Sequence, residues 1–232
     1  SVNKETGLIE SYMFKGKPLL LPGAGRLLVI SDNEDPWGMT VSSFPNIEGE
    51  FKMASEEQAG YICGLKEKTE PVRIIEHGEV RTVIEALFVY KRSTAIMHYK
   101  FEPLTNRLDL ELRLQWNEPN HMVKLSLPSP WEDGECWGQK MLGRSRLYEN
   151  GYENVSQKWL SVCGNDLALT VLNRGSHGSS FENGELRLTL LRSPAYTAHP
   201  IDDRPILPQD RFLPRIDIGE RLFQFSIQGG DR

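Results

Sequence analysis

Hydrophobic and polar residues alternate along several stretches of the chain. In residues 107–116, RLDLELRLQW, every second side chain is apolar, and the same period of two recurs in ELRLTLL (185–191) and FQFSIQ (223–228). Successive side chains of a β-strand point to opposite faces, so this period predicts strands with one buried and one solvated face. The side chains expected to point inward are Leu108, Leu110, Leu112, Leu114, Trp116, Leu186, Leu188, Leu190, Phe223, Phe225 and Ile227.

Turn signals separate these stretches from one another. The dipeptide Asn-Gly in ENGE (182–185) favours a tight hairpin, and EHGEV (76–80) and CGND (163–166) are similar. Residues 81–92 and 93–103 are rich in β-branched and aromatic residues, which is typical of two further strands. The best helical candidate is SEEQAGYICGLKEK (55–68), and its two glycines weaken it. The pattern predicts an all-β, antiparallel sandwich or barrel.

Composition narrows the class of protein. The chain has 232 residues, 39% of them hydrophobic, and a formal net charge of −5. The mild acidity argues against a nucleic-acid partner, which needs a basic face. The sequence also lacks the run of about 20 apolar residues needed to span a membrane, and it begins without a signal-peptide pattern. Three widely spaced cysteines predict reduced thiols in a cytoplasmic protein.

The sequence contains no recognisable catalytic motif. There is no GxSxG, no HExxH and no compact zinc spacing. His199 with Asp202, Asp203 and Asp210 could supply metal ligands, but the same acids could pair with Arg204, Arg211 and Arg215 in a solvated loop, which we favour. We therefore predict neither catalytic nor metal-ligating residues in this chain.

Aromatic residues beside acids indicate a different chemistry. Trp37 lies in DNEDPWGM together with Glu34 and Asp35, and Trp131 and Trp137 lie in SPWEDGECWGQ. Tryptophan stacks on the apolar face of a sugar ring while carboxylates bind its hydroxyl groups, so these stretches are candidates for sugar contacts. The alternative is that the tryptophans cover the open ends of the sandwich.

Taken in order, several segments resemble one known family. They are ETGLIESYMFKGKPLLLPGAG (5–25), EDPWGM (34–39), EHGEVRTVIEALFVYKRSTAIMHYKF (76–101), RLDLELRLQWNEPNHMVKLSLP (107–128), LALTVLNRGSHGSSFENGELRLTLLRSPAY (167–196) and DIGERLFQFSI (217–227). Their ordered occurrence is similar to the C-terminal β-domain of family 38 glycoside hydrolases, the retaining α-mannosidases.

The resemblance implies both a fold and a role. It implies one domain over residues 1–232, a large antiparallel β-supersandwich like that of galactose mutarotase. It further implies that zinc and the aspartate nucleophile belong to an N-terminal catalytic domain absent from this chain. The chain alone would then be inactive, its partners would be that catalytic domain and an α-mannoside, and homo-oligomer formation stays open.

The same resemblance suggests where the substrate lies. Glu34, Asp35 and Trp37 are the first candidates for one wall of the mannoside cleft, because a loop of this domain comes near the sugar in relatives. Arg192, Asp203 and Arg204 are further candidates, since an arginine fork can hold hydroxyls or an acidic loop of the catalytic domain. The proline-rich residues 199–220 read as a semi-rigid arm toward that domain.

Two other functions stay open at this stage. The first is a stand-alone carbohydrate-binding or mutarotase-like protein, in which His98 or His121 would act as the acid opposite a carboxylate base. No motif places a glutamate opposite either histidine. The second is a purely structural interaction module, which a large exposed apolar patch without a concave site would favour.

Overall fold

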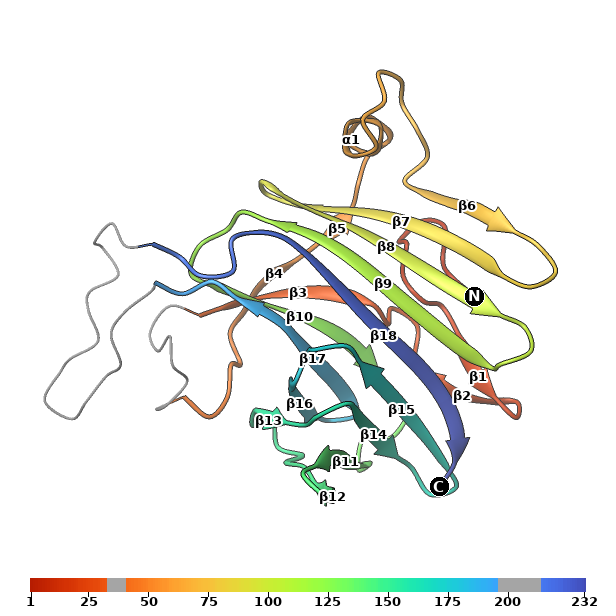
Figure 1. Cartoon of the computed structure of the whole chain (residues 1–232), viewed down its shortest axis with the longest axis vertical. Coiled ribbons are helices and arrows are strands. Elements are labelled where there is room, and N and C mark those ends of the chain that lie inside the picture. Colours follow the sequence, from red (N-terminus) through yellow and green to blue (C-terminus); the bar gives the residue numbers. More distant parts are fainter. Residues whose placement is uncertain (33–40, 196–213) are drawn as a thin grey trace, which may run out of the picture.

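The computed structural model describes residues 1–32, 41–195 and 214–232, which form two large antiparallel β-sheets, a two-stranded sheet and one short helix (Figure 1). In the ten-stranded sheet the order is β12 (Gly143–Arg146), β11 (Glu135–Lys140), β14 (Trp159–Cys163), β15 (Leu167–Asn173), β18 (Gly219–Asp231), β9 (Arg107–Trp116), β8 (Ser93–Glu102), β7 (Thr82–Tyr90) and β5 (Lys52–Met53), with β6 (Val72–His77) also beside β7. The six-stranded sheet has the order β13 (Asn154–Val155), β16 (Gly178–Glu182), β17 (Glu185–Arg192), β10 (His121–Pro128), β3 (Arg26–Ser31) and β4 (Ile47–Glu50). The small sheet pairs β1 (Tyr12–Phe14) with β2 (Lys17–Leu20).

The core lies between the two large sheets and confirms the predicted alternation. All five inward-facing side chains of β9 are at most 1% exposed, and those of β17 are buried as expected. In β18, Phe225 and Ile227 are buried, while Phe223 is partly buried and packs against the same cluster. The sequence therefore predicted correctly which face of these strands points inward, and the all-β sandwich is confirmed.

The predicted turn at residues 182–185 joins β16 to β17. Asn183 (φ 49°) and Gly184 (φ 78°) both occupy the left-handed region, as a two-residue hairpin turn requires. The backbone N–H and the hydroxyl of Ser129 both donate to the carbonyl of Gly184, so this turn is held against the next loop.

The helical candidate at residues 55–68 forms a helix, but only α1 (Glu56–Ile62). Ser55 and Gln58 form a capping box at its start. The helix ends because Gly64 (φ 70°) turns the chain back, and a side chain at Gly60 would lie only 2.2 Å from the carbonyl oxygen of Glu67. The glycines that weaken the helical pattern are therefore the residues that allow the chain to return tightly past the helix.

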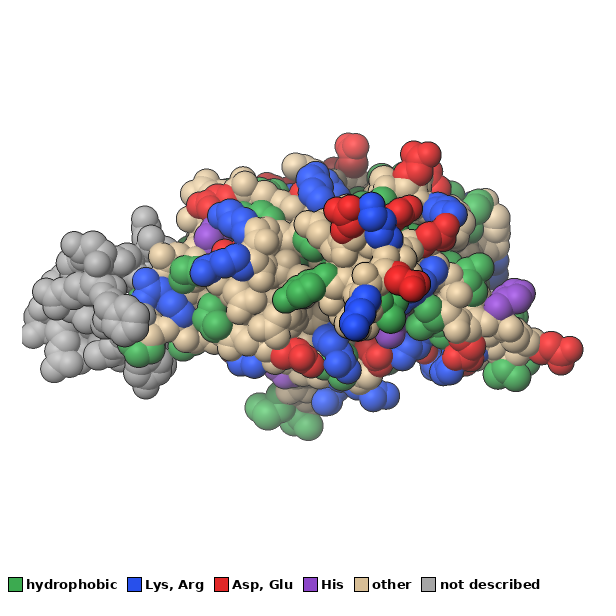
Figure 2. Space-filling model, turned by 90° about the horizontal axis from the view of Figure 1, so that it is seen from above, with side chains coloured by type: hydrophobic (Ala, Val, Ile, Leu, Met, Phe, Trp, Pro, Cys, Tyr) green, Lys and Arg blue, Asp and Glu red, His purple; other side chains and the backbone are tan. Residues whose placement is uncertain are grey.

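Charged side chains cover much of the remaining surface in mixed pairs. Figure 2 shows Lys and Arg lying beside Asp and Glu across the face seen from above. Exposed pairs include Lys4 with Glu70 and Arg81 with Glu76. Such pairs contribute little to stability, about 0–1 kcal/mol each, and their main effect is a well-solvated surface.

The hairpin gives a test of the local backbone. We expect Gly184→Ala to lower the free energy of unfolding by about 1–2 kcal/mol, because Ala is strained at a left-handed φ. Its Cβ would also lie 3.0 Å from the carbonyl oxygen of Ser129. Gly143→Ala, where the added Cβ meets nothing within 4 Å, is the control and should change stability by less than about 0.5 kcal/mol. Urea unfolding measures both, and equal effects would contradict the backbone explanation.

Candidate functional site

In the six-stranded sheet, β17, β10 and β3 lie side by side, and β10 begins where the other two strands end (Figure 1). A cluster of side chains lies at this end of the three strands, which we call the edge of the sheet. Asp32 directly follows β3, Arg192 is the last residue of β17, and His121 is the first residue of β10. Because β10 runs antiparallel between its neighbours, its start lies beside the ends of both. We call Asp32, Phe44, Glu48, His121 and Arg192 the strand-end cluster.

The strongest contact in the strand-end cluster joins Arg192 to Asp32. The guanidinium donates two parallel hydrogen bonds of 2.7 Å to the carboxylate, and the Asp32 side chain is only 1% exposed. Arg192 also lies over the ring of Phe44, 4.9 Å from its centroid. The arginine is therefore fixed in position by a fork-to-fork contact and by an aromatic plane.

His121 and Glu48 form the second contact of the cluster. The Nε2 of His121 lies 2.9 Å from a carboxylate oxygen of Glu48. This hydrogen bond from His121 is the main reason why the pKa of Glu48 lies below its usual value. On the core side, the His121 ring meets the edge of buried Trp116. His121 therefore links the core to the charged rim of the sheet.

Asn120 connects the three stretches of backbone at this edge. Its carbonyl accepts from the N–H of Asp32, its N–H donates to the carbonyl of Ser193, and its side-chain oxygen accepts from the guanidinium of Arg215. Asn120 has a φ of 63°, a left-handed conformation that Asn tolerates better than most residues. Since Ala195 and Arg215 also form a β-bridge, the chain leaves and re-enters this edge beside the same asparagine.

Of the six predicted site residues, the structure describes Arg192. Glu34, Asp35, Trp37, Asp203 and Arg204 lie outside the described residues, as do the alternative metal ligands His199, Asp202 and Asp210. The fork of Arg192 holds a carboxylate of its own chain, Asp32, which the sequence analysis did not single out.

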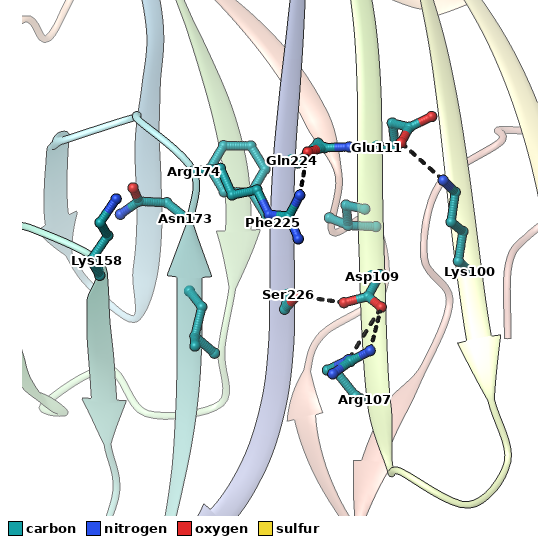
Figure 3. Close-up of a pocket in the computed structure, with 12 residues that line it drawn as sticks. Lys100, Arg107, Asp109, Glu111, Lys158, Asn173, Arg174, Gln224, Phe225 and Ser226 are labelled. Atoms are coloured by element: carbon teal, nitrogen blue, oxygen red, sulfur yellow. Dashed lines mark hydrogen bonds and ion pairs between the residues drawn. The ribbon is translucent and has the colours of Figure 1, made fainter.

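A second candidate region is a polar hollow of about 460 Å³ on the outer face of the ten-stranded sheet (Figure 3). Its side chains come from four neighbouring strands, β8, β9, β18 and β15, and from Lys158 just before β14 and Arg174 just after β15. Arg107 and Ser226 contact Asp109, Lys100 and Gln224 contact Glu111, and Arg174 contacts the other end of Gln224. These residues occupy the solvated positions of the alternating pattern, opposite the buried leucines of β9.

Two carboxylates lie against His98 on the same outer face, although no sequence motif predicts this arrangement. The Nε2 of His98 lies 3.0 Å from Glu85, and its Nδ1 lies 3.6 Å from Glu111. The cross-strand register explains this, because His98 pairs with Glu85 on β7 and with Glu111 on β9. Arg73, which pairs with Glu85, and Lys100, which pairs with Glu111, complete a row of charges on either side of His98.

Trp131 and Trp137, the other aromatic candidates, separate in the structure. Trp131 lies in a loop and packs against the core, in agreement with the covering role considered as the alternative. Trp137 lies within β11 and lines a hollow on the outer face of the ten-stranded sheet.

The described residues contain no cluster of metal-binding side chains and no helix that could span a membrane. No group of three or more His, Cys, Asp or Glu side chains among residues 1–32, 41–195 and 214–232 could hold a metal ion. Zinc therefore has no fitting donor set in this part of the chain. The described helix is too short to cross a membrane.

The contact between Arg192 and Asp32 can be tested by removing its negative charge. We expect Asp32→Asn to lower the free energy of unfolding by about 2–4 kcal/mol, because it removes the buried carboxylate that accepts two hydrogen bonds from the guanidinium of Arg192. Asp166→Asn removes a carboxylate from an exposed pair with Lys17 and should cost at most about 1 kcal/mol. If chemical denaturation gives equal losses for the two variants, the contact does not fix this edge.

The row of charges on the outer face predicts a dependence of stability on pH. Hydrogen bonds from His98, and then from Arg73, hold the pKa of Glu85 below the ordinary value of 4.5. At a pH between the pKa of Glu85 in the folded chain and its pKa in the unfolded chain, the unfolded chain binds more protons. The contribution of Glu85 to the free energy of unfolding is therefore complete above pH 4.5 and is lost as the pH falls below it. We expect the free energy of unfolding of Glu85→Gln to fall less steeply below pH 4.5 than that of the unaltered protein. Parallel curves from denaturation at a series of pH values would contradict this assignment.

Comparison with known proteins supports one family. The family model described as "Glycosyl hydrolases family 38 C-terminal domain" matches residues 2–205. The chain is 25% identical over 172 residues to Alpha-mannosidase G of Dictyostelium discoideum. The matched region covers 67% of this chain and 14% of that protein.

Two solved structures from Enterococcus faecalis have the same fold. A family 38 glycosyl hydrolase superimposes with a TM-score of 0.70 at 10% identity, over 94% of this chain and 27% of that one. An α-mannosidase superimposes with a TM-score of 0.66 at 8% identity, over 94% and 26%. The chain thus spans 14% of the curated relative and about a quarter of each solved structure. Because the family model matches most of its length, this chain belongs to the family of glycosyl hydrolases family 38 C-terminal domains.

Proposed function

We propose that this chain is the non-catalytic C-terminal domain of an α-mannosidase and that it supports the catalytic domain and lines part of the mannoside cleft. The observation that carries the proposal is the family match over residues 2–205, together with relatives whose names specify α-mannosidase. In this proposal the zinc ion and the nucleophile belong to the catalytic domain, and the enzyme works in the cytoplasm.

The strand-end cluster supports the assignment of a cleft wall to this edge. Residues 33–40 begin directly after Asp32, and residues 196–213 begin after Ala195, so both candidate stretches start from the backbone around Asn120. The buried contact between Asp32 and Arg192 makes that starting point rigid. A rigid base lowers the entropy cost of holding an acid or a tryptophan against a sugar.

The fixed Arg192 suits a positioning role. The Nε–H and one terminal N–H of its guanidinium donate to Asp32, and this pair of hydrogen bonds orders the end of β17. The ring of Phe44 on one side restricts its rotation. We therefore assign direct contacts with the mannoside to Glu34, Asp35 and Trp37, and we assign to Arg192 the task of holding their base in place.

The alternative, a sugar mutarotase, receives less support from the geometry. Such chemistry needs a histidine acid and a carboxylate base on opposite sides of one sugar. His98 instead lies in direct contact with Glu85 at 3.0 Å, which leaves no space for a sugar between them. Polarimetry with fresh α-glucose or α-galactose tests this alternative, and catalysed equilibration by the chain would favour it.

The assembled enzyme tests the proposal. When the chain is fused or co-expressed with a family 38 catalytic region, we expect hydrolysis of an aryl α-mannoside. Asp35→Ala and Trp37→Ala should each reduce kcat/KM about tenfold or more, because each removes a contact with the bound sugar. Asp166→Ala, in an exposed pair with Lys17, is the matched control and should leave kcat and KM unchanged. Unchanged kinetics in all three variants would reject the cleft wall, and absence of mannoside hydrolysis would reject the function.

A further inference from the structure

The outer face of the ten-stranded sheet carries a second hollow beside the one in Figure 3. This hollow has a volume of about 610 Å³ and is lined by residues of β11, β12, β14, β15 and β18. The two hollows share Leu172, which is 42% exposed although it lies in the middle of a sheet. We call the two together the outer groove.

The outer groove has small residues on its floor and tryptophans on its wall. Trp137 pairs with Ser161 across β11 and β14, and Trp159 lies two residues before Ser161, so both indoles stand on the same face. Ala168 lies opposite Gly230 in the neighbouring pair of strands. A Cβ placed on Gly230 would meet nothing within 4 Å, which confirms open space above this part of the sheet.

The two tryptophans differ in how much of their surface is available. The guanidinium of Arg144 lies over the ring of Trp137, 5.2 Å from its centroid, and the indole N–H of Trp137 donates to Glu135. No ring contact or hydrogen bond of the Trp159 side chain is recorded within the described part of the protein. Trp159 is therefore the better stacking surface.

The other end of the outer groove is polar. Gln224 and Ser226 offer an amide and a hydroxyl group, and Asp109 and Glu111 offer carboxylates (Figure 3). The exposed side chains of Lys158 and Arg174 add donors, and neither forms an ion pair within the described residues. An apolar plane at one end and many hydroxyl-binding groups at the other are the two halves of a sugar site.

The length of the outer groove bears on the size of the ligand. Its lining residues come from β12, β11, β14, β15, β18, β9 and β8, seven strands in succession. Six spacings of about 4.8 Å give about 29 Å across the sheet. This length exceeds that of a single sugar ring, and it suits a chain of several linked sugars.

We propose that the outer groove binds an oligosaccharide, with one sugar ring stacked on Trp159 and the following hydroxyl groups bound by Thr170, Gln228, Gln224 and Lys158. This groove lies on a different sheet from the strand-end cluster, so it adds a second place where the chain meets sugars. The choice of a mannose oligosaccharide as the ligand rests on the proposed function.

Calorimetric titration of the 232-residue chain with α-linked mannotriose and mannopentaose tests this inference. We expect millimolar or tighter binding that strengthens with oligosaccharide length. Trp159→Ala should weaken binding about tenfold or more, as truncation of a central aromatic does in other interfaces. Trp159→Phe keeps an aromatic plane and should weaken binding less.

Two further variants separate lost binding from lost folding. Gly230→Phe fills the outer groove without removing any contact of the folded chain, and it should also weaken binding about tenfold. Tyr61→Ala removes an aromatic side chain that is 84% exposed on α1, which packs on β7 and β8 at the other end of the sheet from β14, and binding should stay unchanged. Circular dichroism confirms that each variant is folded.

Two results would overturn the inference. The first is the absence of binding to either oligosaccharide at millimolar concentration. The second is binding that Trp159→Ala and Gly230→Phe leave intact. Both results concern the outer groove alone, because hydrolysis by the assembled enzyme depends on the strand-end cluster and the catalytic region and is measured separately.

Discussion

The pairing of β18 with β9 on one side and β15 on the other holds the ten-stranded sheet together. The register runs from Gly219 opposite Trp116 to Gln228 opposite Arg107, and from Asn173 opposite Phe225 to Leu167 opposite Asp231. Without β18 the sheet would divide into two parts, each with a long unpaired edge. Residues of β18 also line both hollows of the outer groove, so the groove exists only when this strand is in place.

Local patterns in the sequence predicted the strands, but they did not predict how those strands pair. The leucines of β9 and the Asn-Gly turn before β17 follow from neighbouring residues, which is why both predictions are confirmed. The position of β18 depends on contacts with β9, more than 100 residues earlier in the chain. A period of two identifies the inward face of a strand and carries no information about its neighbours.

The limits of sequence reasoning are clearest at Arg192. Its residue type indicated a fork for hydroxyls or acids, and the structure provides an acid from 160 positions away, Asp32. Asn120, which joins three stretches of backbone, carried no signal beyond a tolerance for left-handed φ. Trp159 could have been found, because it lies at an outward position of the strand WLSVC, where a large aromatic residue is unusual on a solvated face.

The two sheets differ in what covers their outer faces, and this difference separates their roles. On the six-stranded sheet, Lys124 is 1% exposed because residues 41–46 and 147–153 cross over it, joined by a hydrogen bond from the N–H of Glu153 to the carbonyl of Ser42. Burial lowers the pKa of Lys124, and its contact with the carboxylate of Glu153 offsets part of that effect. On the ten-stranded sheet, α1 covers the outer face only at β7 and β8 within the described residues, where Leu87 is buried against Ala59. Hollows remain over β11, β14, β15, β18 and β9, where the polar side chains bind one another. A covered outer face keeps the strand ends rigid enough to anchor loops. An uncovered stretch of outer face leaves room for an extended ligand. The position of the covering segments therefore directs the two proposed sugar contacts to the edge of one sheet and the face of the other.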